Sequence, residues 1–110
     1  MEKNMKFLMG IIAAVAVMLT SQAFAVDMAA GQALAQKSGC LACHSVATKI
    51  VGPSFKEVAA KYKGNKKAAA MLDEKVAKGG KGVWGQVAMP PNAAVKPADI
   101  KTLVKWVLAQ

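Results

Sequence analysis

Cys40-Leu41-Ala42-Cys43-His44 is the stretch of sequence around which this chain is organised. Two cysteines three positions apart, followed directly by a histidine, have the spacing of a c-type haem attachment site. The two thiols of such a turn form thioether bonds to the vinyl groups of one porphyrin, and the adjacent imidazole becomes an axial ligand of the iron. The chain has two cysteines and one histidine, and all three lie in this stretch. We therefore predict one covalent haem c, attached through Cys40 and Cys43 and ligated by His44.

Residues 1–25 have the three parts of a secretory signal peptide. Two lysines precede an apolar run over residues 7–19, and residues 23–25 (Ala-Phe-Ala) form an A-x-A cleavage site. The apolar run is shorter than the roughly 20 residues that span a membrane, so a cleaved signal peptide is favoured over an uncleaved membrane anchor. We predict cleavage after Ala25, a periplasmic location, and one domain over residues 26–110 without stable membrane insertion.

Lysine dominates the charge of the predicted domain. Residues 26–110 contain thirteen lysines, no arginine and five acidic residues, which gives a net charge of +8. Nucleic-acid binding is disfavoured, because base and phosphate recognition favours the bidentate side chain of arginine. The lysines form either a well-solvated surface or a basic face that steers the protein toward acidic partners. The sequence leaves both interpretations open.

Apolar spacing, glycines and prolines predict an all-α domain of about four short helices. The first helix runs from Met28 to Lys37 with Asp27 as its N-cap. The second has an apolar face over residues 55–62, with a glycine at position 64 ending it. The third has Asn65 as its N-cap and runs through position 77. The last begins at position 97, and its predicted buried stripe is Ile100, Leu103, Val104 and Val107, with Trp106 beside it.

Residues 81–96 follow no helical period, and their glycines and prolines predict a loop. The loop nevertheless carries Val83, Trp84, Val87 and Met89. Loops of this apolar character usually cover an apolar surface. We therefore expect residues 81–96 to cover an apolar part of the domain.

The second axial ligand cannot be another histidine of this chain, and methionine is the usual alternative at such an iron. The predicted domain offers Met28, Met71 and Met89. Met28 lies near the new N-terminus, and Met71 is interpreted as a structural core residue of the third helix. Met89 precedes Pro90 and Pro91, which stiffen the backbone and limit how far its sulfur can retreat. We predict Met89 as the distal ligand, against the alternative that it only packs on the ring.

The motifs of the chain together resemble those of the small class I cytochromes c of bacteria, of the cytochrome c-551 (c8) type. They cover nearly all of residues 26–110 at compatible spacings. The resemblance implies a class I cytochrome c fold, with about four short helices wrapped around one covalent haem c. The matching segments are residues 40–44 (CLACH), 51–55 (VGPSF), 58–61 (VAAK), 82–85 (GVWG), 89–92 (MPPN) and 102–108 (TLVKWVL).

The resemblance also implies residues that support the two ligands. The backbone carbonyl of Pro53 accepts from the free N–H of His44, which fixes the ring and raises its basicity. Asn92 donates a hydrogen bond to the sulfur of Met89. Both roles are implied by the resemblance alone.

Two further residues are implied as partners of the haem propionates. Trp84 points its indole N–H at a propionate, and Lys75 stands at the position of a basic propionate partner. A propionate turned inward needs such donors, because burying it unpaired is costly. The alternatives are core packing for Trp84, as expected for Trp106, and a solvated helix-face charge for Lys75.

The chain departs from this family pattern at a few positions, none of which is a predicted ligand. Gln86 and Ala88 stand where relatives often carry proline, so the methionine loop is expected to be less rigid. Residues 92–96 are one residue longer than usual, and Lys96 replaces the expected Ser or Asp cap of the last helix.

These observations predict a monomeric, non-enzymatic one-electron carrier. Its partners are respiratory redox proteins: a donor such as a quinol-oxidising complex and an acceptor such as a terminal oxidase or nitrite reductase. Redox encounters of this kind are small and transient. The resemblance implies an apolar docking surface surrounded by lysines. This surface comprises Ile50, Val51, Val87, Pro90 and Pro91, with Lys37, Lys49, Lys78, Lys81 and Lys96 around it.

Three other readings of the attachment motif remain. An open-site haem protein, such as a peroxidase-like enzyme or gas sensor, follows if Met89 does not bind the iron. A haem-free thiol oxidoreductase is disfavoured, because its Cys-x-x-Cys motif needs a βαβ context that this sequence lacks. A zinc site is disfavoured by the lack of a fourth ligand.

Overall fold

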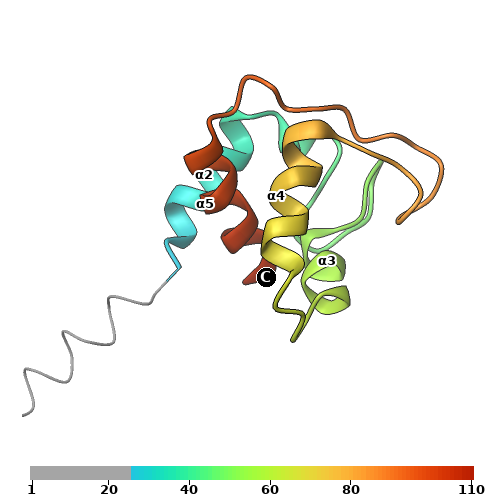
Figure 1. Ribbon diagram of the computed structural model, residues 1–110, viewed down its shortest axis with the longest axis horizontal. Coiled ribbons are helices and arrows are strands. Elements are labelled where there is room, and N and C mark those ends of the chain that lie inside the picture. Colours follow the sequence, from blue (N-terminus) through green and yellow to red (C-terminus); the bar gives the residue numbers. More distant parts are fainter. Residues whose placement is uncertain (1–25) are drawn as a thin grey trace, which may run out of the picture.

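Helix α5 is the centre of the fold, because each of the other three helices packs against it (Figure 1). The computed structural model describes residues 26–110 of the chain. Within that part the regular elements are helical, which confirms the predicted all-α architecture. The elements are α2 (Met28–Lys37), a 3₁₀ turn η2 (Cys40–Ala42), α3 (Phe55–Lys61), α4 (Ala68–Lys78) and α5 (Pro97–Leu108).

The predicted signal peptide and its cleavage after Ala25 lie outside the described residues. Among residues 26–110, no helix has the length and hydropathy that a membrane crossing needs. Export and cleavage therefore stay predictions.

Helix α2 has the predicted bounds and the predicted N-cap. Asp27 Oδ1 accepts a hydrogen bond from the backbone N–H of Ala30 at 2.9 Å, which satisfies one of the free donors of the first turn. Gly31 is buried where α2 crosses α5, and a β-carbon at this position would collide with the ring of Trp106. Helices α2 and α5 therefore approach each other more closely here than a residue with a side chain would allow.

Helix α5 buries most of its predicted stripe and differs at one position. Ile100, Leu103 and Val104 are at most 4% exposed. Trp106, expected beside the stripe, is itself 2% exposed, whereas Val107 is only partly buried. The tryptophan is buried because it fills the contact with α2 that Gly31 leaves open.

Helix α4 begins at Ala68, three residues after the predicted cap, so the prediction that Asn65 caps this helix is wrong. Asn65 Oδ1 instead accepts from the N–H of Lys67 at 2.9 Å, a local side-chain turn that competes with capping. The core interpretation of Met71 is also wrong, because its side chain is 42% exposed. Met71 lies about 100° around the helix from Leu72, which is partly buried and lines the cavity described below.

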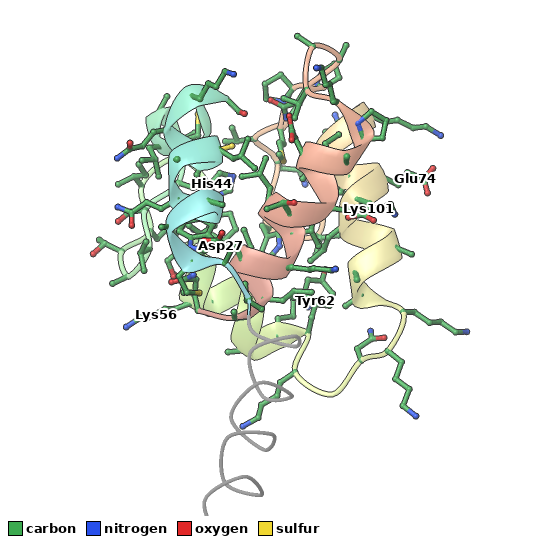
Figure 2. All side chains as sticks on the ribbon, turned by 90° about the vertical axis from the view of Figure 1, so that its left-hand side faces the viewer. Asp27, His44, Lys56, Tyr62, Glu74 and Lys101 are labelled. Atoms are coloured by element: carbon green, nitrogen blue, oxygen red, sulfur yellow. The ribbon has the colours of Figure 1, made fainter. Side chains whose placement is uncertain are left out.

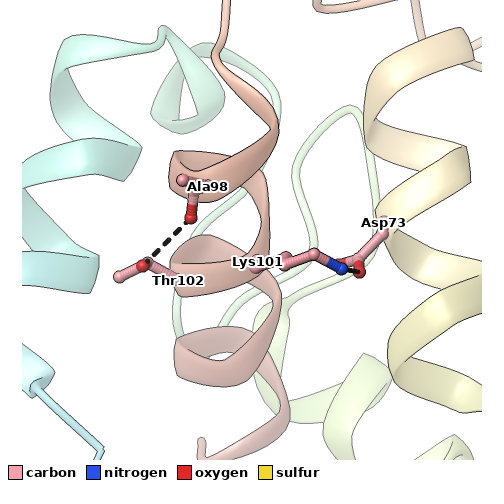
Figure 3. Close-up of polar contacts among 4 residues, drawn as sticks. All are labelled: Asp73, Ala98, Lys101 and Thr102. Atoms are coloured by element: carbon pink, nitrogen blue, oxygen red, sulfur yellow. Dashed lines mark hydrogen bonds and ion pairs between the residues drawn. The ribbon is translucent and has the colours of Figure 1, made fainter.

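An ion pair joins α4 to α5 on the solvent side of the fold (Figure 3). Lys101 Nζ lies 3.1 Å from Asp73 Oδ2, while the other oxygen, Asp73 Oδ1, is buried without a hydrogen-bond partner among the described residues. The next residue, Glu74, points outward into solvent (Figure 2). The Asp73–Lys101 pair therefore links the two helices that form one wall of the site described below.

Candidate functional site

A cavity of about 390 Å³ opens between the attachment turn and the loop that follows α4. Side chains and backbone from η2, α3, α4, α5 and the loop line it, and most of them are apolar. Of the eight residues predicted from the sequence for the site, only Asn92 does not line the cavity. The seven that do are Cys40, Cys43, His44, Pro53, Lys75, Trp84 and Met89.

The attachment turn presents both thiols and the imidazole to the same cavity. Cys40 O accepts from the N–H groups of Cys43 at 3.2 Å and His44 at 2.9 Å, so one carbonyl closes the turn. Both cysteines are free and partly buried. Burial raises the pKa of the Cys40 thiol, since the charged thiolate is poorly solvated there. The turn thus has the arrangement that covalent haem attachment needs.

His44 is oriented by a hydrogen bond to the backbone. Its Nδ1 lies 2.7 Å from the carbonyl oxygen of Pro53, which is the contact that the resemblance implies. A carbonyl oxygen can only accept, so the ring proton lies on Nδ1 and the lone pair of Nε2 is available to a metal. Gly52 is required beside the ring, because a β-carbon there would lie 2.6 Å from Cε1 of His44.

Aromatic contacts connect the His44 ring to the hydrophobic core. Phe55 stacks on His44 with ring centroids 5.2 Å apart and an interplanar angle of 22°. Phe55 in turn meets Trp106 edge to face at 5.1 Å, and both of these aromatic residues are buried. The imidazole is therefore fixed by packing as well as by its hydrogen bond.

Met89 is the methionine that reaches the cavity. Among the described methionines, Met28 and Met71 are 45% and 42% exposed and do not line it. Met89 is partly buried, and its backbone forms an antiparallel β-bridge with Gly80. The two hydrogen bonds of this bridge have N···O distances of 2.8 and 3.0 Å. The structure thus brings Met89 to the same cavity as His44, from a segment far away in the sequence.

Lys75 and Trp84 lie at the same cavity, and Lys61, which does not line the cavity, contacts Trp84. Trp84 is 39% exposed, so it does not pack in the core as Trp106 does. Lys61 Nζ lies 5.5 Å from the centroid of the Trp84 ring and 5.9 Å from that of Tyr62, which is a cation–π arrangement. The Lys75 side chain is partly buried, with its Nζ against Gly80. The sequence alone assigned Lys61 no role. The one sequence feature that pointed to this residue was its place in the matching segment 58–61.

Asn92 makes a different hydrogen bond from the one that the resemblance implies. Its Nδ2 donates to the carbonyl of Val76 at 3.0 Å and, more weakly, to that of Pro90 at 3.5 Å. No hydrogen bond from Asn92 to the Met89 sulfur occurs within the described part of the chain. The side chain is drawn toward α4 because the last carbonyls of a helix lack partners within the helix.

The residues present fit one haem c. Two thiols on one turn, an imidazole with a free Nε2 and a thioether share one largely apolar cavity. Two glycines, Gly52 and Gly80, keep the walls clear where a β-carbon would meet His44 or Lys75. Within residues 26–110, histidine, cysteine and carboxylate side chains form no group of three that could hold a metal ion, so the zinc alternative gains no support.

Comparisons with known proteins agree with this site. The cytochrome c family model matches residues 28–110. Cytochrome c-551 of Allochromatium vinosum is 56% identical over 89 residues, which is 81% of this chain and 95% of that protein. Cytochrome c-551 of Pseudomonas aeruginosa is 48% identical over 79 residues, 72% of this chain and 75% of that protein. The crystal structure of Nitrosomonas europaea cytochrome c552 aligns with a TM-score of 0.69 at 50% identity, covering 71% of this chain and 96% of that one.

The family model covers the attachment turn, the helices and the methionine loop together. The two cysteines in their Cys-x-x-Cys-His arrangement are the attachment points of one covalent haem c. The chain belongs to the cytochrome c family, as a small class I member of the cytochrome c-551 type.

Proposed function

We propose that this electron-carrying cytochrome moves single electrons through a haem c whose iron is held by His44 and Met89. The observation that carries the proposal is that both side chains line the cavity that also holds the two attachment thiols. His44 comes from the turn before α3, and Met89 comes from the loop after α4. Two segments far apart in the sequence therefore converge on one site.

The residues around the cavity are arranged to keep both ligands in place. When bound, the haem supplies an iron that takes up and releases one electron. The Pro53 carbonyl holds the proton of His44 on Nδ1 and raises the basicity of Nε2. A methionine ligand raises the reduction potential, which suits a carrier that delivers electrons to a terminal acceptor. Both ligands are supported by backbone groups, so little has to move when the charge changes.

The basic and aromatic residues at the cavity are proposed to bind the haem propionates. Trp84 offers its indole N–H, and Lys75 offers a partly buried ammonium group. Lys61 lies over the Trp84 ring and holds its orientation. Donors of this kind offset the cost of keeping a carboxylate away from water.

We place the carrier in the periplasm as a monomer, after cleavage of the signal peptide following Ala25. Its partners in this proposal are respiratory redox proteins, such as a quinol-oxidising complex and a terminal oxidase or nitrite reductase. The proposed docking surface is apolar and open to solvent: Ile50 is 48%, Val51 53% and Val87 69% exposed. The lysines expected around it are exposed, which favours an acidic partner.

Carbon monoxide binding to the ferrous holoprotein tests the ligand assignment. The wild-type protein should bind CO slowly, because Met89 occupies the sixth position, and Met89→Ala should bind it rapidly. Met71→Ala is the matched control, since Met71 is exposed on α4 and does not line the cavity, and it should behave like the wild type. Rapid binding by the wild type would contradict the carrier proposal and favour the open-site alternative.

A further inference from the structure

The C-terminal end of α4 holds the segment that carries Met89. Gly80 and Met89 exchange two backbone hydrogen bonds. Three residues further on, Asn92 donates twice to the carbonyl of Val76, from its backbone N at 3.1 Å and from Nδ2 at 3.0 Å. We call residues 76–80 together with residues 89–92 the α4–Met89 clasp.

Gly79 lies at the centre of the clasp and leaves no room for a side chain. Its φ of +74° is in the left-handed region that favours glycine. A β-carbon at Gly79 would collide with the carbonyl oxygen of Met89 and lie 2.9 Å from both Pro90 C and Pro91 N. All three are backbone atoms, two of them in the stiff Pro90-Pro91 pair, so they cannot turn away as a flexible side chain can.

The intervening loop, residues 81–88, lines the cavity but makes no backbone hydrogen bond to the rest of the described fold. Its one backbone hydrogen bond within the described residues is internal, from Gly82 N to Gly85 O at 2.8 Å. Its contact with the rest of the fold includes the cation–π pair of Trp84 and Lys61. The backbone hydrogen bonds that position Met89 are therefore those of the clasp.

We propose that Gly79 is a positioning residue for Met89, and that opening of the α4–Met89 clasp controls the access of small ligands to the sixth iron position. The inference rests on the proposed function, because it requires Met89 to be an iron ligand. A side chain at position 79 pushes the Met89 backbone away from α4. The sulfur then leaves its place at the cavity while the covalent attachment at Cys40 and Cys43 stays intact.

Gly79→Ala tests the inference, and Gly64→Ala is its matched control. Gly64 has a similar φ of +77°, but a β-carbon there meets no atom within 4 Å, so this variant carries the backbone strain without the collision. The readouts are the far-red absorption of a ferric iron–methionine bond, the reduction potential and CO binding to the ferrous holoprotein. We expect Gly79→Ala to lose much of the absorption, to have a lower potential and to bind CO about tenfold faster, because CO reports the open population.

The outcomes separate the inference from the function on which it rests. A wild-type protein without the iron–methionine absorption overturns the ligand assignment itself. If the wild-type protein has this absorption and the Gly79→Ala variant keeps it, the proposed role of Gly79 is overturned. Equal losses in Gly79→Ala and Gly64→Ala also overturn it, since general strain then explains the effect. Losses confined to Gly79→Ala support it.

Hydrogen exchange in the wild-type holoprotein covers the case in which Gly79→Ala does not fold. The amides of Met89 and Asn92 donate within the clasp, whereas those of Gln86 and Val87 make no hydrogen bond in the described structure. We expect the Met89 and Asn92 amides to exchange at least about tenfold more slowly than the two loop amides. Equal exchange rates for the four amides would overturn the clasp.

Discussion

His44 is held by side chains that continue into the core, whereas Met89 is held by backbone contacts at the surface of the fold. On the histidine side, the imidazole stacks on Phe55, which meets Trp106, and both of these are at most 5% exposed. On the methionine side, the contacts are the bridge to Gly80 and the hydrogen bonds to Val76 O, beside a loop that makes no backbone hydrogen bond to the rest of the described fold. The two proposed axial ligands therefore depend on different parts of the molecule.

The difference shows how one small domain can combine a proposed ligand that is fixed by the core with a proposed ligand that can be displaced locally. Core packing is close and cooperative, so the histidine side can move only if the core is disturbed. Backbone hydrogen bonds at a surface open locally at a lower free energy than global unfolding. Damage to the histidine side should therefore appear as lost stability, and damage to the methionine side as lost ligation.

Phe55→Ala should give the largest change in stability and the strongest test of this contrast. It removes the ring between His44 and Trp106 and leaves a cavity, which costs about 3–5 kcal/mol of unfolding free energy. Guanidinium unfolding of the ferric holoprotein, followed by circular dichroism, measures this change. Met71→Ala, at a position of α4 that is 42% exposed and does not line the cavity, is the control and should stay within about 0.5 kcal/mol of the wild type. A loss below about 1 kcal/mol for Phe55→Ala would contradict the comparison.

Lys101→Ala should give an intermediate effect, because it removes the partner of a largely buried carboxylate. Asp73 is 21% exposed at its side chain and has one oxygen already without a partner, so we expect a loss of about 1 kcal/mol. Lys78→Ala breaks the exposed helical pair with Glu74, 3.0 Å long, and should cost about 0.3–0.5 kcal/mol. Equal losses of unfolding free energy for the two variants, measured by urea unfolding, would show that the burial of Asp73 does not strengthen its ion pair with Lys101.

Ala88→Pro should give the smallest effect and act on the methionine side alone. The N–H of Ala88 makes no hydrogen bond within the described residues, so proline removes no contact and restricts the unfolded chain. The expected gain is about 0.5 kcal/mol, with slower CO binding to the ferrous protein. Ala88→Gly should shift both measurements in the opposite direction. Faster CO binding by Ala88→Pro would contradict this expectation. It would mean that the clasp closes only when the loop backbone stays flexible at position 88.

The sequence was sufficient where local signals decide the structure. Asp27 before an amphipathic segment predicted both the cap and the bounds of α2. The attachment motif and the Met89 motif predicted which side chains reach the cavity, because the residues that form the local turn lie next to the functional side chains in each motif. The family resemblance supplied the contact between His44 and Pro53, which local patterns do not contain.

The sequence was insufficient where contacts between distant segments decide. Asn65 has the residue type of a helix cap, but its carboxamide closes a turn with Lys67 before the helix begins. Asn92 binds Val76 O, an acceptor sixteen positions away that no local pattern indicates. In the sequence, Gly79 indicates only the end of a helix. Its contact with the Met89 backbone is known only from the structure. The one sequence signal was a second glycine directly after it, where a single glycine is enough to end a helix.

The contact between Gly31 and Trp106 has a consequence for how the domain forms. It joins the first described helix to the last, so a chain made from its N-terminus cannot complete its core until the final segment is available. Contacts of such long sequence separation form late and slow the search for the native state. Leu103, Val104 and Val107 of this last helix also line the cavity that contains Cys40 and Cys43. Until α5 packs, that cavity lacks one wall, so both thiols are more accessible in the partly folded chain than in the folded domain.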